Sequence, residues 1–320
     1  MTRAVDEPRA GTAPYALGWV LIEWNRAWPA EAIDALGDVG AQLRARVGGL
    51  PVRLQLIRRP GAHVDRQRSC RVFVAHTGQQ PWMERFDVGS VAQLAEVPIE
   101  SATSTVAPGI GSDLDQPMVL VCAHASRDQC CAVIGRPVAA ALFSALGEMV
   151  FEASHVGGHR FAGNVVCLPR GVVLGGLDPS NAVELVREAS SLPGTRQLST
   201  GILPFVRGRS SLHPHEQAAE LAVADHTGDL ASSVVTTTSV DPATPAAMAG
   251  SATGADARHQ RDGDELARHT VVVHSSGREF IVDVRQRATG RAVLASCGDD
   301  ALTPMTTFDC VELTEIRRCC

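Results

Sequence analysis

Lysine is absent from the 320-residue sequence, so all 29 basic residues are arginine. Without a primary amine on any side chain, the protein cannot form a lysine Schiff base or hold a phosphate with a P-loop lysine. Basic residues are not in excess either, because the formal net charge is −6 and the pI is near 6.0. A nucleic-acid-binding surface would be basic and clustered. We therefore expect no nucleic-acid partner.

Aromatic residues are scarce at 4%, although hydrophobic residues reach 45%, which is ordinary for a packed globular protein. Residues 1–14 are polar and lack the apolar core of a signal peptide, and no apolar run approaches the ~18–20 residues of a membrane span. We therefore expect a cytoplasmic protein without a membrane partner. In a reducing compartment, nine cysteines indicate metal binding or catalysis more than a disulfide framework.

The apolar runs predict an α/β fold with a smaller N-terminal half, residues 15–100. This half has the β-α-β-β order of an open sheet. Its expected elements are a strand at 17–24, a helix at 30–47, strands at 54–57, 71–76 and 82–86, and a short helix at 91–95.

Residues 115–226 form a second unit with the order of elements of a thioredoxin-like open sheet. Its expected elements are a strand at 118–121, a helix that begins at Pro137 and runs to about Leu146, a strand at 149–153, a hairpin of 161–168 and 171–174, and helices from Asp178 and over 214–224. Residues 227–265 are rich in small and polar residues, which favours a flexible linker. Short strands over 266–318, with a turn at Ser276-Gly277, predict a small β-rich appendage.

Cysteines and histidines gather at the ends of two predicted strands of the second unit. Cys122 comes directly after the first strand, and Cys131 follows after eight further residues. His155 and His159, which are separated by three residues, follow the second strand. Two thiolates and two imidazoles suit either tetrahedral zinc or a [2Fe–2S] cluster with both histidines on one iron. Cys130 competes with Cys131 for the second thiolate position.

Gly157 and Gly158 separate the two histidines and disfavour a helix there, because two glycines cost roughly 2 kcal/mol relative to alanine in a helix interior. They favour a tight loop whose backbone approaches a bulky ligand and presents N–H donors. The bridging sulfides of a cluster accept such hydrogen bonds, whereas a single zinc ion has none to offer. The cysteine spacing also disfavours zinc, whose paired cysteines usually lie two to four residues apart.

Three strings in this region resemble the sucrase/ferredoxin-like family. They are C-A-H-A-S-R-D-Q-C-C from Cys122, G-R-P-V-A-A-A-L from Gly135 and H-V-G-G-H-R-F-A-G-N from His155. Weaker similarity, including L-I-R-R-P and R-V-F-V-A, extends the resemblance over about residues 17–224. Ala125 departs from the glycine that relatives commonly have at that position.

The resemblance implies a thioredoxin-like [2Fe–2S] ferredoxin that exchanges one electron with a redox partner protein. In the part of the family that has a histidine pair, two cysteines and two histidines bind the cluster. Those ligand roles fall here on Cys122, Cys131, His155 and His159.

Four further residues are expected beside the cofactor or its ligands: Gly157, Gly158, Arg160 and His124. For His124 the alternative is a structural polar contact. For Arg160 the alternative is an ordinary ion pair with Asp128 or Glu152.

Two other functions remain open. A thiol-disulfide oxidoreductase would use Cys122 or Cys130, although the sequence contains no C-x-x-C and a bond between the vicinal Cys130 and Cys131 would be strained. A structural zinc module would contain zinc without iron or sulfide. No carboxylate pair indicates sugar hydrolysis, so we expect an electron carrier more than an enzyme.

The predicted centre should have a reduction potential that depends on pH. Neutral imidazoles in place of two thiolates should raise the potential relative to an all-cysteine ferredoxin, and imidazoles that reach water couple oxidation state to protonation. We expect the potential to fall with rising pH above the imidazole pKa of the oxidised state, in a potentiometric titration between roughly pH 6 and 9. A constant potential over that range would contradict the coupling.

Overall fold

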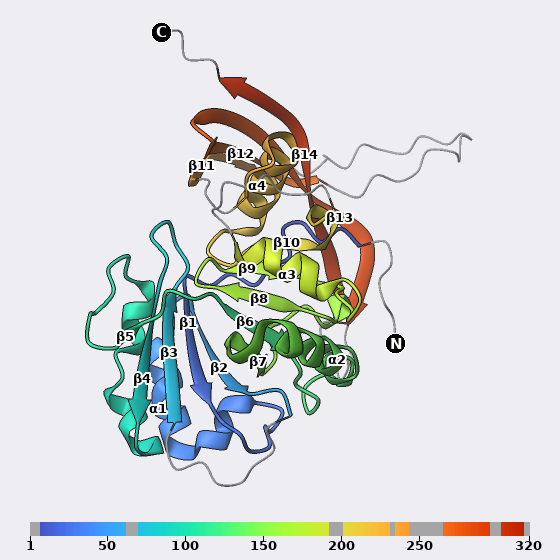
Figure 1. Ribbon diagram of the computed structural model, residues 1–320. Coiled ribbons are helices and arrows are strands. Elements are labelled where there is room, and N and C mark those ends of the chain that lie inside the picture. The colour runs from blue at the N-terminus through green and yellow to red at the C-terminus, as the bar shows by residue number, and fades with distance from the viewer. Residues whose placement is uncertain are drawn as a thin grey trace.

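The computed structural model describes residues 7–61, 70–191, 201–230, 234–242, 265–294 and 302–316 (Figure 1). The strands of these residues form two sheets, one of ten strands and one of four. The ten-stranded sheet contains both predicted α/β units, which are therefore two halves of one sheet. The terminal pair Cys319-Cys320 lies outside the described residues.

The N-terminal half of the large sheet contains five strands: β1 (Gly18–Glu23), β2 (Val52–Arg58), β3 (Cys70–His76), β4 (Trp82–Val88) and β5 (Ser112–Asp113). The helices of this half are η1 (Ala32–Leu36), α1 (Gly37–Val47), η2 (Val91–Glu96) and η3 (Ile99–Thr103). Helices η1 and α1 connect β1 to the parallel β2, and β3 lies antiparallel on the other side of β1. The expected β-α-β-β order is confirmed.

The second half repeats this arrangement with β6 (Met118–Cys122), β7 (Val150–Ala153), β8 (Val165–Leu168), β9 (Val172–Leu174) and the edge strand β10 (Val206–Arg209). Its helices are α2 (Gln129–Leu146), η4 (Gly147–Met149), η5 (His159–Phe161), α3 (Ala182–Ser190) and η6 (Leu203–Phe205). Helix α2 connects β6 to the parallel β7, and β8 lies antiparallel on the other side of β6.

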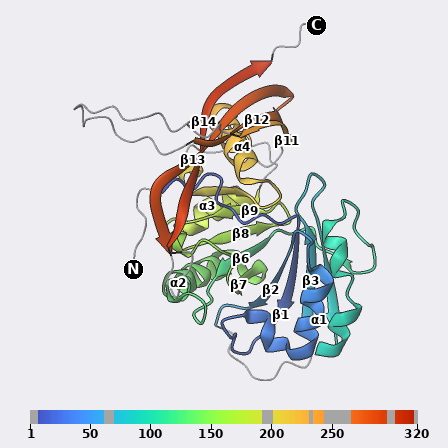
Figure 2. The ribbon, with the colours of Figure 1, turned by 180° about the vertical axis from the view of Figure 1, so that it is seen from behind.

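The two halves therefore share one topology, with the strand orders β2-β1-β3-β4 and β7-β6-β8-β9. They meet at an antiparallel contact between β2 and β7, where Ile57 pairs with Ala153 and Arg58 pairs with Glu152. In both views, strands β8 and β9 run across the direction of β1 and β3 (Figures 1 and 2). The large sheet thus consists of two halves of the same topology joined by a short seam.

Each half buries one face of its strands under its own helices and the other face against the opposite half. Helices α2 and α3 cover the core that contains Val121 and Leu142, and α1 covers the core that contains Val20 and Leu43. The remaining core contains side chains of both halves, among them Trp19, Phe73, Leu120 and Phe151. The cysteines Cys122, Cys130 and Cys131 belong to this shared core.

The four-stranded antiparallel sheet packs on helix α4 (Pro214–Thr227), which follows β10. Its strands are β11 (Val234–Pro242), β12 (Glu265–Ser275), β13 (Arg278–Leu294) and β14 (Leu302–Ile316). Ala219 and Val223 of α4 contact a core that includes Val273 and Phe280. Ser276 and Gly277 both have positive φ, 52° and 75°, which confirms the expected hairpin turn. A β-rich sheet at the C-terminal end agrees with the sequence.

Two local expectations differ from the structure. Helix α2 begins at Gln129, eight residues before Pro137, so this proline lies inside the helix. Its ring is tolerated on the exposed face, where the lost hydrogen bond is solvated. Strand β11 lies within 227–265, where a linker was expected, because the β-branched run V-V-T-T-T-S-V pairs with β12 despite its small residues.

Residues Gln129–Met149 of α2 and η4 are long and apolar enough to cross a membrane by length and composition alone. This helical stretch is longer than any uninterrupted apolar run in the sequence, because it includes a few polar residues. Its apolar side chains Val138, Ala139 and Leu142 are fully buried in the core beside β6. These three side chains of α2 therefore pack in the protein core.

Gly135 of α2 lies in close contact with the end of β6. A Cβ atom there would lie 1.9 Å from the carbonyl oxygen of Cys122, so Gly135→Ala must push α2 away from the end of β6. We expect a loss of about 1–3 kcal/mol in the free energy of unfolding, measured by urea denaturation. Ala140→Ser, on the exposed face of the same helix, is the matched control and should cost less than about 0.5 kcal/mol. Equal stability of the two variants would contradict the close approach.

Candidate metal centre

The first two candidate ligands are positioned by the contact between β6 and α2. Cys122 is the last residue of β6, and its backbone N–H donates to the carbonyl of Asn164 at 3.0 Å. Cys131 lies in the first turn of α2, and its N–H donates to the carbonyl of Asp128 at 3.0 Å. Each cysteine is only 1% exposed. The missing side chain of Gly135 allows the two cysteines to approach each other.

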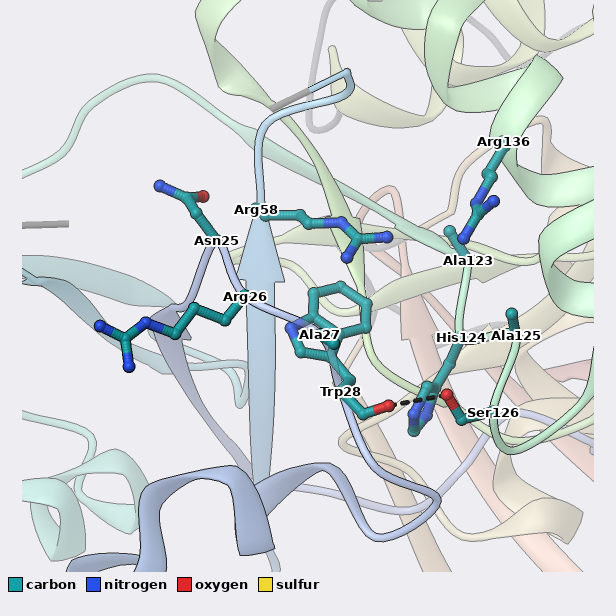
Figure 3. Close-up of a pocket in the computed structure, with 10 residues that line it drawn as sticks. All are labelled: Asn25, Arg26, Ala27, Trp28, Arg58, Ala123, His124, Ala125, Ser126 and Arg136. Carbon is teal, nitrogen blue, oxygen red and sulfur yellow. Dashed lines mark hydrogen bonds between the residues drawn. The ribbon is translucent and has the colours of Figure 1, made fainter. Parts of the chain in front are cut away.

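The loop between β6 and α2 is held by the N-terminal half of the protein. Ser126 donates its hydroxyl to the carbonyl of Trp28 at 2.7 Å (Figure 3). The Nε2 of His124 lies 2.8 Å from the carbonyl oxygen of Pro29, which makes Nε2 the donor and leaves Nδ1 as an acceptor. That Nδ1 accepts the backbone N–H of His155 at 3.3 Å. Burial lowers the pKa of His124, which favours this neutral form.

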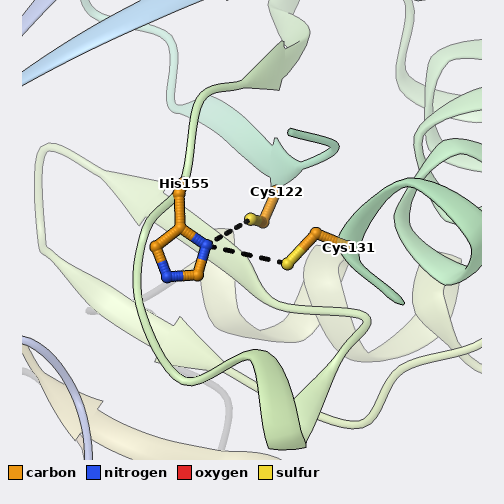
Figure 4. Close-up of side chains that lie close together, drawn as sticks. All are labelled: Cys122, Cys131 and His155. Carbon is orange, nitrogen blue, oxygen red and sulfur yellow. Dashed lines mark hydrogen bonds between the residues drawn. The ribbon is translucent and has the colours of Figure 1, made fainter. Parts of the chain in front are cut away.

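His155, in the loop after β7, completes a group of three possible ligands. Its Nδ1 lies 3.9 Å from the Sγ of Cys122 and 3.7 Å from the Sγ of Cys131 (Figure 4). The three ligand atoms all lie within 4.8 Å of one another. Two sulfurs and one imidazole nitrogen form a donor set that fits a soft or borderline metal. The protein therefore has a possible metal-binding site at the positions that the sequence indicates.

The sulfurs and the imidazole share hydrogen bonds that stabilise one thiolate. The Cys131 thiol, His155 and the backbone N–H of Val156 all donate to Cys122, so the pKa of Cys122 lies well below its usual value. The pKa of Cys131 is raised, because its thiol donates a hydrogen bond to Cys122 and is itself buried. Asp128 adds a buried carboxylate, whose Oδ2 lies 3.2 Å from His155 Nδ1. A bound metal would take the place of the protons held in this group.

The loop after His155 turns through two glycines with positive φ, 91° at Gly157 and 75° at Gly158. A Cβ atom on Gly158 would lie 2.4 Å from the guanidinium of Arg207. Gly158 is therefore required for two reasons, the left-handed backbone and the close approach of the arginine.

Arg207, on β10, is a buried cation behind this loop and is 2% exposed. Its Nη1 donates to the carbonyl of Gly157 at 3.0 Å and to Oδ1 of Asn164 at 2.9 Å, while Nε and Nη2 donate to Thr12. Burial lowers the pKa of Arg207 to about 9, and the Cys122 thiolate opposes this shift. The guanidinium thus stays protonated at neutral pH and acts favourably on negative charge at the sulfurs.

Three of the remaining predicted residues lie around this group without joining it. The Cys130 thiol donates to the carbonyl oxygen of His159 at 3.7 Å, and its sulfur is not one of the three grouped ligand atoms among the described residues. The ring of His159 is not part of the three-ligand group among the described residues; the residue begins η5 and is 9% exposed. Arg160 pairs with Glu7 at 2.6 Å, rather than with Asp128 or Glu152. Its role at a cofactor stays a prediction.

Comparison with known proteins agrees with this geometry. The family model described as sucrase/ferredoxin-like matches residues 10–208, more than half of the chain. The chain belongs to the sucrase/ferredoxin-like family. Searches of curated proteins and of solved structures found no match. The matched segment covers the ten-stranded sheet up to β10 and contains all three ligand candidates of this family member.

Sequence reasoning missed the residues that support the site from a distance. Arg53 and Gln55 of β2 lie with their side-chain nitrogens 3.4 Å from the carbonyl oxygen of His155. Nothing in an ordinary strand sequence marks them, since their role follows from the seam between β2 and β7. The sequence does mark Arg207 and Gly135. Glycine is unusual inside a strand or a helix, and it occurs in R-G-R at Arg207 and in G-R at Gly135.

Arg207 should raise the reduction potential of a metal centre at this site, because a buried positive charge favours the more negative, reduced state. We expect Arg207→Met to lower the potential by on the order of 50 mV in a spectroelectrochemical titration. Arg207→Lys keeps the charge and should retain most of the shift, whereas the exposed Arg187→Met should change little. If Arg207→Met and Arg187→Met have the same potential, the buried charge does not act on the centre.

Proposed function

We propose that the protein is a one-electron carrier with a [2Fe–2S] cluster bound by Cys122, Cys131, His155 and His159. The observation that carries this proposal is the convergence of two buried thiols and one imidazole nitrogen within 4.8 Å in a chain of the sucrase/ferredoxin-like family. The family name includes ferredoxin, and ferredoxins bind their clusters through cysteine thiolates.

His159 is proposed as the fourth ligand although its ring lies outside the three-ligand group. A binuclear cluster distributes its ligands over two metal atoms, so its four ligand atoms need not lie within the radius of one ion. His159 follows the same glycine turn as His155, and its side chain is largely buried. The glycine turn that joins the two histidines keeps His159 in the same loop as His155, beside the grouped ligand atoms.

The surroundings suit electron transfer. The sulfurs are buried away from water, Val156 offers a backbone N–H to sulfur, and Arg207 offers a positive charge. These are the features through which a protein adjusts the potential of a cluster. The side chain of His155 is 19% exposed and is the ligand closest to solvent. We infer that electrons enter and leave at His155, in exchange with a soluble redox protein of the cytoplasm.

The two alternative functions are less well supported by the same geometry. A thiol-disulfide oxidoreductase needs a nucleophilic sulfur that can reach its substrate, whereas Cys122 is 1% exposed and Cys130 is 7% exposed. A zinc site is compatible with the three ligand atoms, and metal analysis separates it from a cluster. The cysteine spacing of eight residues remains an argument against zinc.

The proposal predicts a reddish-brown protein that contains iron and acid-labile sulfide. After anaerobic purification, the visible absorption should bleach with dithionite while an EPR signal of a reduced [2Fe–2S] cluster appears. Cys122→Ser, Cys131→Ser, His155→Ala and His159→Ala should each lose most of the bound iron, because each removes one ligand. Cys130→Ser and the exposed Cys310→Ser are the matched controls and should keep it. A colourless protein with one zinc per chain would reject the electron carrier.

A further inference from the structure

Two cavities lie on either side of the loop Ala123–Ser126, beside the candidate metal centre. One, of about 390 Å³, lies between this loop, Trp28 and the end of β2 (Figure 3). The other, of about 340 Å³, is lined by His155 itself and by residues of β2 and η1. His124 lines both cavities. The most exposed of the candidate ligands therefore opens onto a hollowed surface between the two halves of the protein.

This surface is rich in arginine, although the chain as a whole has a net charge of −6. The two cavities have one carboxylate residue among their lining residues, Glu31. Their arginines number six: Arg26, Arg44, Arg53, Arg58, Arg127 and Arg136. Arginines thus outnumber carboxylates among the lining residues, although the whole chain is negative.

Three of these arginines are already neutralised by a carboxylate. Arg58 pairs with Glu152 at 2.8 Å, Arg44 with Asp34 at 2.5 Å and Arg127 with Glu31 at 2.7 Å. The other three are Arg26, whose guanidinium lies 5.3 Å from the centre of the Trp24 ring, Arg53 and the exposed Arg136. Figure 3 shows the side chain of Arg136 descending from α2 toward Ala123. Positive charge therefore borders the loop on both sides.

Arg53 is the clearest sign that a carboxylate is missing from this surface. Its Nε is buried and has no hydrogen-bond partner in the described part of the chain. Its Nη2 donates to the carbonyl of His155 at 3.4 Å, and its guanidinium lies 5.7 Å from the centre of the Trp19 ring. Burial lowers the pKa of Arg53, and the Cys122 thiolate opposes this shift. A buried cation short of acceptors is costly unless a ligand supplies them.

We propose that this arginine-lined surface docks an acidic protein, whose carboxylates bind Arg53 and Arg136 and bring its redox centre beside His155. The inference rests on the proposed function, because it names the kind of partner with which the electron is exchanged. Complementary charge would orient the partner and speed its association without requiring a large interface. The negative charge of the rest of the chain would repel the same partner from other faces.

The test uses the full chain and a fluorescein-labelled oligoglutamate peptide, followed by fluorescence anisotropy. We expect the peptide to bind, and its dissociation constant to rise steeply between about 10 mM and about 150 mM ionic strength. Arg136→Gln and Arg53→Gln should each weaken binding roughly threefold or more. Arg187→Gln removes the same charge from the exposed face of α3 and should leave the dissociation constant unchanged. Arg136 is exposed, so its variant remains informative if Arg53→Gln fails to fold.

Equal weakening by Arg136→Gln and Arg187→Gln, or binding of an oligolysine peptide as tight as that of oligoglutamate, would overturn the proposal. Sulfate is compared with sodium chloride of equal ionic strength as a competitor of the peptide. If only sulfate displaces the peptide, the surface binds small anions, and the proposal of a protein partner is overturned. The absorption spectrum of the same samples shows whether the cluster is present. Failure of docking with the cluster intact is thus distinguished from failure of the proposed function.

Discussion

The whole site depends on the contact between Gly135 and the carbonyl of Cys122. A helix can lie this close to the end of a strand only where it has no side chain. The contact places the first turn of α2, with Cys131, against the last residue of β6, with Cys122. The parallel strand β7 then delivers His155 to the same end of the sheet, because β6 and β7 are adjacent. The absence of a Cβ atom at Gly135 thus allows the two sulfurs and the imidazole to lie close together.

The second constraint is the repeated topology of the sheet. The second half contains the candidate ligands, while the N-terminal half contributes the groups that hold them. Pro29 binds the ring of His124, which in turn binds the backbone of His155, and Gln55 lies beside the His155 carbonyl. The β2–β7 contact brings these groups together. The N-terminal half is therefore part of the site's structure although it provides none of the three grouped ligand atoms.

Much of this could be predicted from local sequence. The strand that ends at Cys122 and the glycine pair after His155 are short-range patterns, and both are found where they were expected. The predicted start of α2 was wrong. Pro137 by itself is a strong signal for the first turn of a helix, whereas tertiary packing extends the helix eight residues toward the N-terminus, to Gln129. The contribution of β2 could not be predicted, because it depends on strand pairing across about a hundred residues. The position of the His159 ring depends on the rotation of one loop, which sequence spacing does not specify.

The seam between β2 and β7 also limits how this protein can be divided. A fragment of residues 115–226 would have the candidate ligands, yet it would lose the carbonyl that fixes His124 and would expose the apolar strand face that packs against Trp19 and Phe73. A sheet with that apolar face exposed to water would be prone to aggregate. The smallest unit that keeps the candidate site intact is therefore the fused pair of halves, even though the three grouped ligand atoms all come from one of them.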